Sequence, residues 1–348
     1  MLITFLDNGQ TYDGSTLNKR PLGASEKSLI LLAETLSSIG HVVRIFNNCK
    51  KSRVVNKVSW NPLNTMNANH SDIWISLNDP KLFDLCDFNN KKVLWLIKSG
   101  LQLSRPDNFK STMRHNPTII YQGESHINSI PDGLKSLDAK MISLGVYEKY
   151  FELEELTSSV TPKAFVTTNP LMGLDWLINL WINHIHTKLP WAELHIFSIT
   201  MYNGMHGKDV ADRYLSILDK LKINTNYNIH VKKPEVDAEF IKHIKDMRVH
   251  LYPSHQFESS ALTLQESQVM GIPAVVRPLG AAPEKIYNGK TGFVAQDDNT
   301  FSEYTIRLLS DLSYFKRISN KAKEMHVDSK WNNIAEKFIK VFKLGNLK

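Results

Sequence analysis

Short apolar runs alternate along the chain with longer segments in which apolar residues recur every three or four positions. The short runs have the length and β-branched content of buried strands, and the longer segments have the spacing of amphipathic helices. In the first part of the chain the predicted strands are residues 2–6, 42–46, 72–76, 92–97, 118–122 and 140–146. Strands that alternate with helices are typical of parallel sheets covered on both faces. We therefore predict an α/β protein with doubly wound sheets.

The first predicted helix lies between the first two strands. Residues 25–40 carry a continuous apolar face, with Ser25 expected as the N-cap and Gly40 as the C-cap. The resulting order of strand, helix and strand makes a βαβ unit.

A change of pattern indicates a domain boundary. Residues 147–161 are acidic and lack strand alternation, and a second series of strands and helices begins at residue 163. The predicted strands of this series are residues 163–168, 192–197, 227–231, 249–253, 274–277 and 291–295. We therefore predict two domains, residues 1–155 and residues 156–330.

The C-terminal segment has a helical pattern of its own. Trp331, Ile334 and Phe338 recur at helical spacing and give one apolar face. We expect residues 331–348 to form a helix that returns to pack on the first domain.

Composition narrows the class of protein. With 348 residues, of which 42% are hydrophobic, the chain has enough apolar material for two domains. The net charge of +7 suits an anionic ligand, but the lysines are spread along the chain, which argues against nucleic acid. The same charge leaves open a peripheral contact with an anionic membrane surface. The sequence indicates no particular oligomeric state.

Cysteine use and apolar runs indicate the compartment. Cys49 and Cys86 have no ligand-like spacing, which argues against a disulfide scaffold or a cysteine zinc site. The apolar N-terminal run is too short for a signal peptide, and no later run approaches the roughly 20 residues of a membrane span. We expect a cytoplasmic protein, at most peripheral at the inner face of the membrane.

Two glutamates flank a predicted helix start after the strand at 249–253. Ligands of open parallel sheets bind beyond the carboxyl ends of strands, so this loop is a candidate site. Amides at a helix N-terminus can point at a diphosphate, and here the expected amides are those of Ala261, Leu262 and Thr263. Carboxylates accept hydrogen bonds from hydroxyl groups, so we expect Glu266 to bind a ribose diol and Glu258 to bind sugar hydroxyls.

Residues 257–298, FESSALTLQESQVMGIPAVVRPLGAAPEKIYNGKTGFVAQDD, resemble the donor-site block of the retaining glycosyltransferases of family four, which have the GT-B fold. The family pattern is Glu, seven residues and Glu, followed by a small residue, Gly, Pro and two valine-like residues, then Gly-x-Pro-Glu and Asn/Asp-Gly-x-Thr-Gly-Phe; this chain has Gly-x-x-Pro-Glu at residues 280–284. Residues 169–197, residues 22–46 and the C-terminal WNNIAEKF segment are similar to further blocks of the family. The resemblance implies two Rossmann-like domains facing a central cleft: the N-terminal one for the acceptor and the C-terminal one for the nucleotide sugar.

The resemblance also implies roles for individual residues. Glu258 would contact the donor sugar at the reaction centre, and Glu266 would contact the ribose. Gly23 would let the N-terminal loop approach the diphosphate, and Asn169 and Gly173 would belong to the donor-binding site. The phosphates would be held by Ser260, Ala261, Leu262 and Thr263. No metal and no cofactor are implied: the donor is a nucleoside-diphosphate sugar, and the acceptor is a glycan or a lipid-linked molecule.

One departure from the family pattern concerns the loop after the strand at 163–168. Family members carry an arginine and a lysine there, both directed at the diphosphate, whereas this chain has Asn169 and Met172. We expect other cations to replace them, and the candidates are Lys98, as a residue of the catalytic centre, and Lys232 and Lys233 near the donor.

Three functions remain to be compared. The first is a metal-independent retaining glycosyltransferase of the hexosyltransferase type. The second is a catalytically weak or inactive GT-B protein that binds nucleotide or glycan, or supports a partner enzyme, and Asn169 and Met172 favour it. The third, a nicotinamide-dependent oxidoreductase, is disfavoured because no G-x-G-x-x-G follows residues 2–6.

Overall fold

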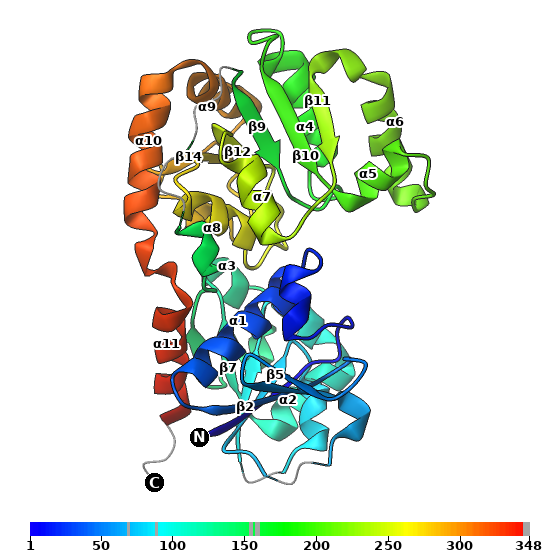
Figure 1. Cartoon of the computed structure of the whole chain (residues 1–348), viewed down its shortest axis with the longest axis vertical. Helices are drawn as coiled ribbons and strands as arrows, with labels where there is room; N and C mark the ends of the chain where they lie inside the picture. Colours follow the sequence, from blue (N-terminus) through cyan, green and yellow to red (C-terminus); the bar gives the residue numbers. More distant parts are fainter. Residues whose placement is uncertain (68–69, 88–89, 153–155, 157–160, 344–348) are drawn as a thin grey trace. The chain divides into compact units, whose positions relative to one another are not determined.

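The computed structural model describes residues 1–67, 70–87, 90–152, 156 and 161–343. The chain forms two compact units, Met1–Tyr147 with Ser329–Lys348 and Glu148–Asp328 (Figure 1). The sequence pattern predicts these divisions at 155/156 and 330/331. Within the described residues, we find no helix with the length and apolar character needed to cross a bilayer.

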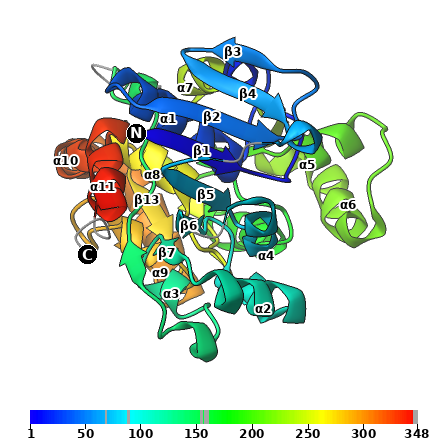
Figure 2. The same cartoon turned by 90° about the horizontal axis from the view of Figure 1, so that it is seen from below.

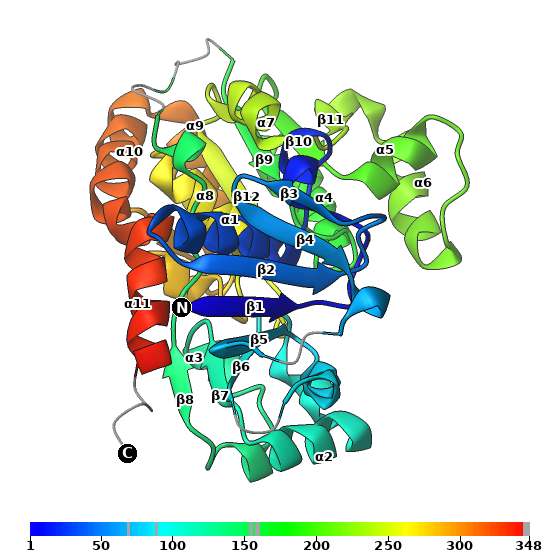
Figure 3. The same cartoon turned by 60° about the horizontal axis from the view of Figure 1, so that its bottom comes forward.

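The first unit contains an eight-stranded sheet whose strands lie side by side in Figure 3. All neighbouring strands are parallel except β3, which pairs with β4 in a hairpin. In sheet order the strands are β3 (Arg53–Val55), β4 (Val58–Pro62), β2 (Val42–Asn47), β1 (Leu2–Leu6), β5 (Ile73–Leu77), β6 (Lys91–Trp95), β7 (Thr118–Tyr121) and β8 (Ala139–Met141). The helices are α1 (Ala24–Ser38), α2 (Pro106–His115), α3 (Glu124–Ile127) and α11 (Trp331–Lys343).

Helix α1 begins earlier than the sequence pattern predicts. Its N-cap is Gly23 instead of Ser25, because the helical conformation already starts at Ala24. The Ser25 hydroxyl accepts a hydrogen bond from Asn78, so it is not used as a cap. The C-cap is Ile39 instead of Gly40; Gly40 follows it with φ +95°, a conformation that favours glycine.

The C-terminal helix packs on the first unit, as predicted. Figure 2 shows α11 beside α1, and the two helices are in contact. The Phe338 ring meets the Trp95 ring edge to face at 5.2 Å, and the Lys91 ammonium donates to the Val341 carbonyl. Trp331, Ile334 and Phe338 are at most 2% exposed, which shows that the predicted apolar face is the buried one.

The second unit contains a six-stranded sheet that is parallel throughout. In sheet order the strands are β11 (Ile229–Lys232), β10 (Glu193–Phe197), β9 (Lys163–Val166), β12 (Val249–Tyr252), β13 (Ala274–Val276) and β14 (Gly292–Val294). The helices are α4 (Leu174–Leu180), α5 (Ile199–Met205), α6 (Leu215–Ile223), α7 (Asp237–Ile244), α8 (Leu262–Val269), α9 (Asp298–Ser310) and α10 (Leu312–Met325). The two sheets confirm the predicted doubly wound α/β fold.

The strand order of the second unit places a switch point between β9 and β12. From β9 the chain proceeds to β10 and β11 on one side of the sheet, and it returns to β12, β13 and β14 on the other. Because the connections leave in opposite directions, the loops after β9 and β12 border the crevice in which such sheets bind ligands.

Candidate active site

The two loops at the switch point touch each other. Gly173, at the end of the loop after β9, has φ +95°, and a Cβ atom placed on it would lie 2.7 Å from the Pro253 Cβ. Both the conformation and the contact therefore require glycine. Pro253 follows β12 directly, so Gly173 fixes how closely the α4 loop approaches the α8 loop.

The loop from β12 to α8 begins and ends on left-handed residues that are not glycine. Ser254 has φ 58° and Ala261 has φ 46°. This conformation costs an L-residue about 1–2 kcal/mol, and such strain is typical of functional loops. Ala261 is the N-cap of α8 and offers no capping side chain. The start of α8 therefore has no side-chain cap.

Glu258 lies in this loop and is partly buried. Burial raises the pKa of its carboxyl group, while hydrogen bonds from the Tyr252 side chain and the Ala261 amide oppose that rise. The predicted phosphate ligand Ala261 therefore donates its amide to Glu258 in this structure. Leu262 and Thr263 follow it in the first turn of α8.

The Gly-x-x-Pro-Glu turn, residues 280–284, packs against the loop that carries Glu258. The Ala281 amide donates to the Glu258 carbonyl at 3.0 Å. Gly280 has φ +56°, and an added Cβ would lie 2.2 Å from the His255 carbonyl oxygen. No larger residue fits between these segments, so close packing explains the glycine at this position of the family pattern.

Glu266 is 1% exposed and faces the interior of the second unit. Its carboxylate is a hydrogen-bond partner of the buried Tyr150 hydroxyl, which also donates to Asp237 at 2.5 Å. Burial, Glu266 and Asp237 together raise the pKa of Tyr150. Glu266 is thus anchored by a residue that precedes the second sheet, and the predicted contact with a ribose remains a prediction.

A buried hydrogen-bond chain lies beneath α8. The His250 ring joins Ser267 on one side at 2.9 Å and Thr167 on the other at 3.1 Å, and the Thr167 hydroxyl bonds to Thr263 at 2.9 Å. Burial lowers the pKa of His250 to about 3, so its ring is neutral. The sequence pattern does not identify His250 as a residue of the site. The feature that could have identified it is a histidine inside an apolar strand.

Asn169 and Met172 form a local turn. The Asn169 side chain accepts a hydrogen bond from the Leu171 amide at 3.0 Å, and its carbonyl accepts one from the Met172 amide at 2.8 Å. Asn169 therefore acts as a turn residue ahead of α4.

A cation that the sequence analysis missed lies at the same edge of the sheet. Arg277 follows β13, donates to the Pro253 carbonyl at 2.6 Å and lies 4.5 Å above the Trp176 ring. The Trp176 indole in turn donates to Asp298 at 3.0 Å. Arg277 is thereby held beside the residue that touches Gly173.

The predicted cations Lys232 and Lys233 lie at the end of the edge strand β11, and both are exposed. Two strands separate β11 from β12, which is about 14 Å at the ordinary spacing of strands. Lys232 lines a cavity of about 230 Å³ with His195 and Lys163. The structure thus does not bring either lysine next to the start of α8.

Gly23 and Lys98 belong to the first unit. A Cβ added to Gly23 would lie 2.7 Å from the Glu26 carboxylate, so an acid already occupies the amino end of α1. Lys98 is exposed, and its amide is fixed by a 2.9 Å bond to the Asn78 side chain. With Asp7 it lines a cavity of about 340 Å³ at the carboxyl ends of β1, β5 and β6.

Asp7 is the buried acid of this cavity. It accepts hydrogen bonds from the Tyr12 hydroxyl at 2.8 Å and from the Gly9 amide at 3.0 Å. Burial raises the pKa of its carboxyl group, and these two bonds and the Lys98 charge lower it. The cavity therefore combines a carboxyl group with an exposed ammonium group.

Comparison with known proteins finds a family model that matches part of the second unit. Residues 164–311 match the family model "Glycosyl transferases group 1". The chain is 24% identical over 274 residues to a trehalose synthase of Pyrococcus horikoshii, a match that covers 72% of this chain and 64% of that protein. The chain thus spans less than two thirds of the length of this relative.

Solved structures with the same fold cover nearly the whole chain. A sucrose-phosphate synthase of Thermosynechococcus elongatus has a TM-score of 0.72 at 12% identity, covering 98% of both chains. WaaG, a glycosyltransferase of lipopolysaccharide biosynthesis, has a TM-score of 0.70 at 13% identity, covering 99% of this chain and 100% of its own. HepE of Anabaena, solved with UDP and glucose, has a TM-score of 0.67 at 12% identity, covering 98% of this chain and 99% of its own. Residues 164–311 therefore resemble the glycosyl transferases group 1 family, and the chain as a whole has the GT-B fold.

Proposed function

We propose that the protein is a retaining glycosyltransferase that moves a hexose from a nucleoside-diphosphate sugar to a glycan or a lipid-linked acceptor. One observation carries the proposal. At the switch point of the family-matched unit, the strained loop between Ser254 and Ala261 holds Glu258 at the uncapped start of α8. A helix start beside a fixed carboxylate suits a ligand with a diphosphate and a hydroxylated sugar.

In this proposal the leaving diphosphate binds at the first turn of α8. The amides of Leu262 and Thr263 and the charge of Arg277 take up its negative charge, a role for which the class needs no metal ion. The buried chain through His250 and Thr167 fixes Thr263 and so keeps the helix start in place. Arg277 thus takes part of the role assigned in the family to the cations that Asn169 and Met172 replace.

Glu258 binds the hydroxyl groups of the donor sugar in the transition state. Its hydrogen bonds to Tyr252 and Ala261 orient the carboxylate before the sugar arrives. The acceptor hydroxyl attacks from the side on which the diphosphate leaves, and it gives its proton to a phosphate oxygen. This geometry retains the anomeric configuration.

Two measurements test the proposal. A thermal-shift screen with UDP, GDP, ADP, CMP and dTDP, with and without attached sugars, should show stabilisation by one nucleotide series. With that donor, proton NMR of the transfer product should show the donor's anomeric configuration. An inverted product would refute the retaining mechanism, and the absence of any stabilisation would refute the nucleotide-sugar assignment.

A GT-B protein that binds nucleotide or glycan without efficient transfer is the second candidate. The observation that favours it is the neutral pair Asn169 and Met172, whose turn is stabilised by backbone bonds. In that case the thermal shift would persist while no transfer product formed with any acceptor.

A further inference from the structure

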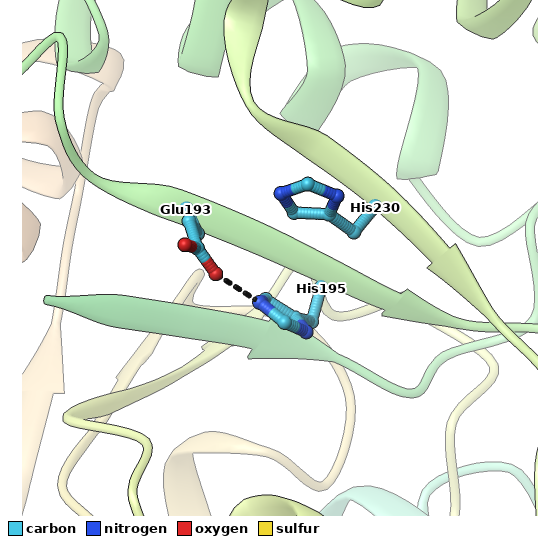
Figure 4. A group of neighbouring side chains, drawn as sticks. All are labelled: Glu193, His195 and His230. Carbon is cyan, nitrogen blue, oxygen red and sulfur yellow. Dashed lines mark hydrogen bonds and ion pairs between the residues drawn. The ribbon is translucent and has the colours of Figure 1, made fainter. Parts of the chain in front are cut away.

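Three side chains capable of binding a metal lie on one face of the second sheet, on the adjacent strands β10 and β11. Glu193 and His195 are two residues apart on β10, so they point to the same face. His195 is directly opposite His230 on β11. Figure 4 shows the carboxylate and the two rings on the same side of these strands.

The distances suit a common ligand. The Glu193 carboxylate is 2.8 Å from His195 Nε2, and the two imidazole rings are 5.1 Å apart between centroids. One donor atom from each of the three residues lies within 4.8 Å of the other two. Ligands at about 2.1 Å from a tetrahedral ion lie roughly 3.4 Å apart, so modest side-chain rotations complete the geometry.

The burial of the three residues differs in a way that allows this rotation. His195 is 8% exposed and is held by the Glu193 carboxylate. His230 is exposed on the edge strand, where its ring has room to turn toward the other two. Two imidazoles and one carboxylate are a typical ligand set for zinc when a further position is left to water or an anion.

We propose that Glu193, His195 and His230 bind a divalent transition metal, with Zn²⁺ as the preferred ion. The site is independent of the proposed transfer reaction, because β11 is the edge strand and β9 and β10 lie between it and β12. It links β11 to β10 through three side chains. A bound ion therefore stabilises the free edge of this sheet.

Neighbouring charges affect the site in opposite directions. Partial desolvation lowers the pKa of both histidines and Glu193 raises it; the net lowering favours the neutral rings that a metal needs. Lys232 and Lys163 repel a cation and lower its affinity. The same lysines, with His195, line the cavity of about 230 Å³ and favour an anion as the remaining ligand of the metal.

The test uses the full chain without a histidine tag, stripped of metal and titrated with ZnCl₂ against a chromogenic chelator. The wild type should bind one equivalent. His230→Asn should lower the affinity at least about 10-fold, as should Glu193→Gln. His184→Asn, at an exposed histidine of the same unit, should change nothing.

A second measurement identifies the ligands. Co²⁺ added to the metal-free wild type should give the intense visible bands of a four-coordinate ion, and His230→Asn should lose them. Because His230 is exposed, this variant should keep its unfolding temperature in the absence of metal, which separates loss of the site from loss of the fold. Binding by His230→Asn and Glu193→Gln equal to that of the wild type, or no stoichiometric binding at all, would overturn the proposal.

Discussion

The carboxyl edges of the two sheets are shaped by different features. In the second unit the edge is shaped by the backbone: two strained residues, Ser254 and Ala261, bracket the loop that carries Glu258, and Gly173 and Gly280 allow close approaches. In the first unit the edge is shaped by side chains, with Asp7 and other ionisable groups around a cavity.

This difference explains why the family model matches residues 164–311, within the second unit. Backbone shape depends on glycine, proline and small residues at fixed spacings, and such residues leave a recognisable pattern. A cavity lined by charged side chains can be built from many sequences. The family model therefore matches the second unit, whereas a cavity lined by charged side chains, as in the first unit, leaves no such pattern.

The largest expected effect falls on the second unit. Glu258→Gln keeps the size of the side chain but removes the charge, and we expect transfer to fall by about 10³-fold. Nucleotide affinity should stay within a few-fold, because in the proposed function the diphosphate binds to the helix start and not to Glu258. Steady-state kinetics and calorimetry measure the two quantities, and Glu303→Gln, at an exposed acid on α9, is the control. Full activity of Glu258→Gln would remove the carboxylate from the reaction centre.

The corresponding test in the first unit is Lys98→Met. If the ammonium group serves the reaction, kcat should fall by about 100-fold, the size typical of losing one charge-stabilising donor. Because the side chain is exposed, the unfolding temperature should not change. Lys81→Met, in the same cavity, is the matched control. Equal kcat values for Lys98→Met and Lys81→Met would show that Lys98 has no special part in the reaction.

The same contrast shows how far the sequence alone predicts the structure. The alternating strands and helices were predicted because their periodicity is local. The β3–β4 hairpin was not, because its turn uses Asn56 and Lys57, both left-handed, without the glycine that usually marks such turns.

In the site, the sequence located Glu258 and the start of α8 through a motif within one segment. It missed the partners of these residues, because Tyr150 meets Glu266, and Thr167 meets Thr263, only after the sheet has formed. Arg277 was missed for the same reason: its contacts with Pro253 and Trp176 join three separate loops.

A pH titration tests whether the stability of the second unit depends on the neutral state of His250. The pKa of His250 is about 3 in the folded state and near 6.5 when unfolded. Between these values the unfolded chain binds a proton that the folded chain does not, so the free energy of unfolding falls as the pH falls. The loss is about 1.4 kcal/mol per pH unit, or about 2 kcal/mol between pH 6.5 and pH 5.

The variant His250→Gln should be less stable at pH 7.5 but should lack this part of the pH dependence. Denaturant unfolding at pH 7.5 and pH 5 should therefore show its deficit relative to the wild type shrinking by about 2 kcal/mol. Burial lowers the pKa of His115, in the first unit, to about 4. This adds a similar pH dependence to the free energy of unfolding of both proteins, so it cancels in the difference between them. A deficit that is constant with pH would mean that His250 binds protons equally in the folded and unfolded states.

The smallest effect that we predict is an increase in nucleotide affinity. Asn169→Arg with Met172→Lys restores two cations ahead of α4, and nucleotide affinity should rise about 10-fold, or about 1.4 kcal/mol. The gain should shrink at high salt because these side chains are partly exposed. Asn169→Ala is the control, since it removes only the hydrogen bond that Asn169 accepts from Leu171.

The outcome of this double substitution also separates the two candidate functions. If affinity and transfer rise together, the protein is an enzyme whose donor side is held mainly by backbone geometry. If affinity rises and no transfer appears with any acceptor, the second candidate, a GT-B binding protein, is correct. If neither changes, residues 169 and 172 do not face the phosphates, and the contrast between a backbone-shaped donor edge and a charge-lined first unit loses its support.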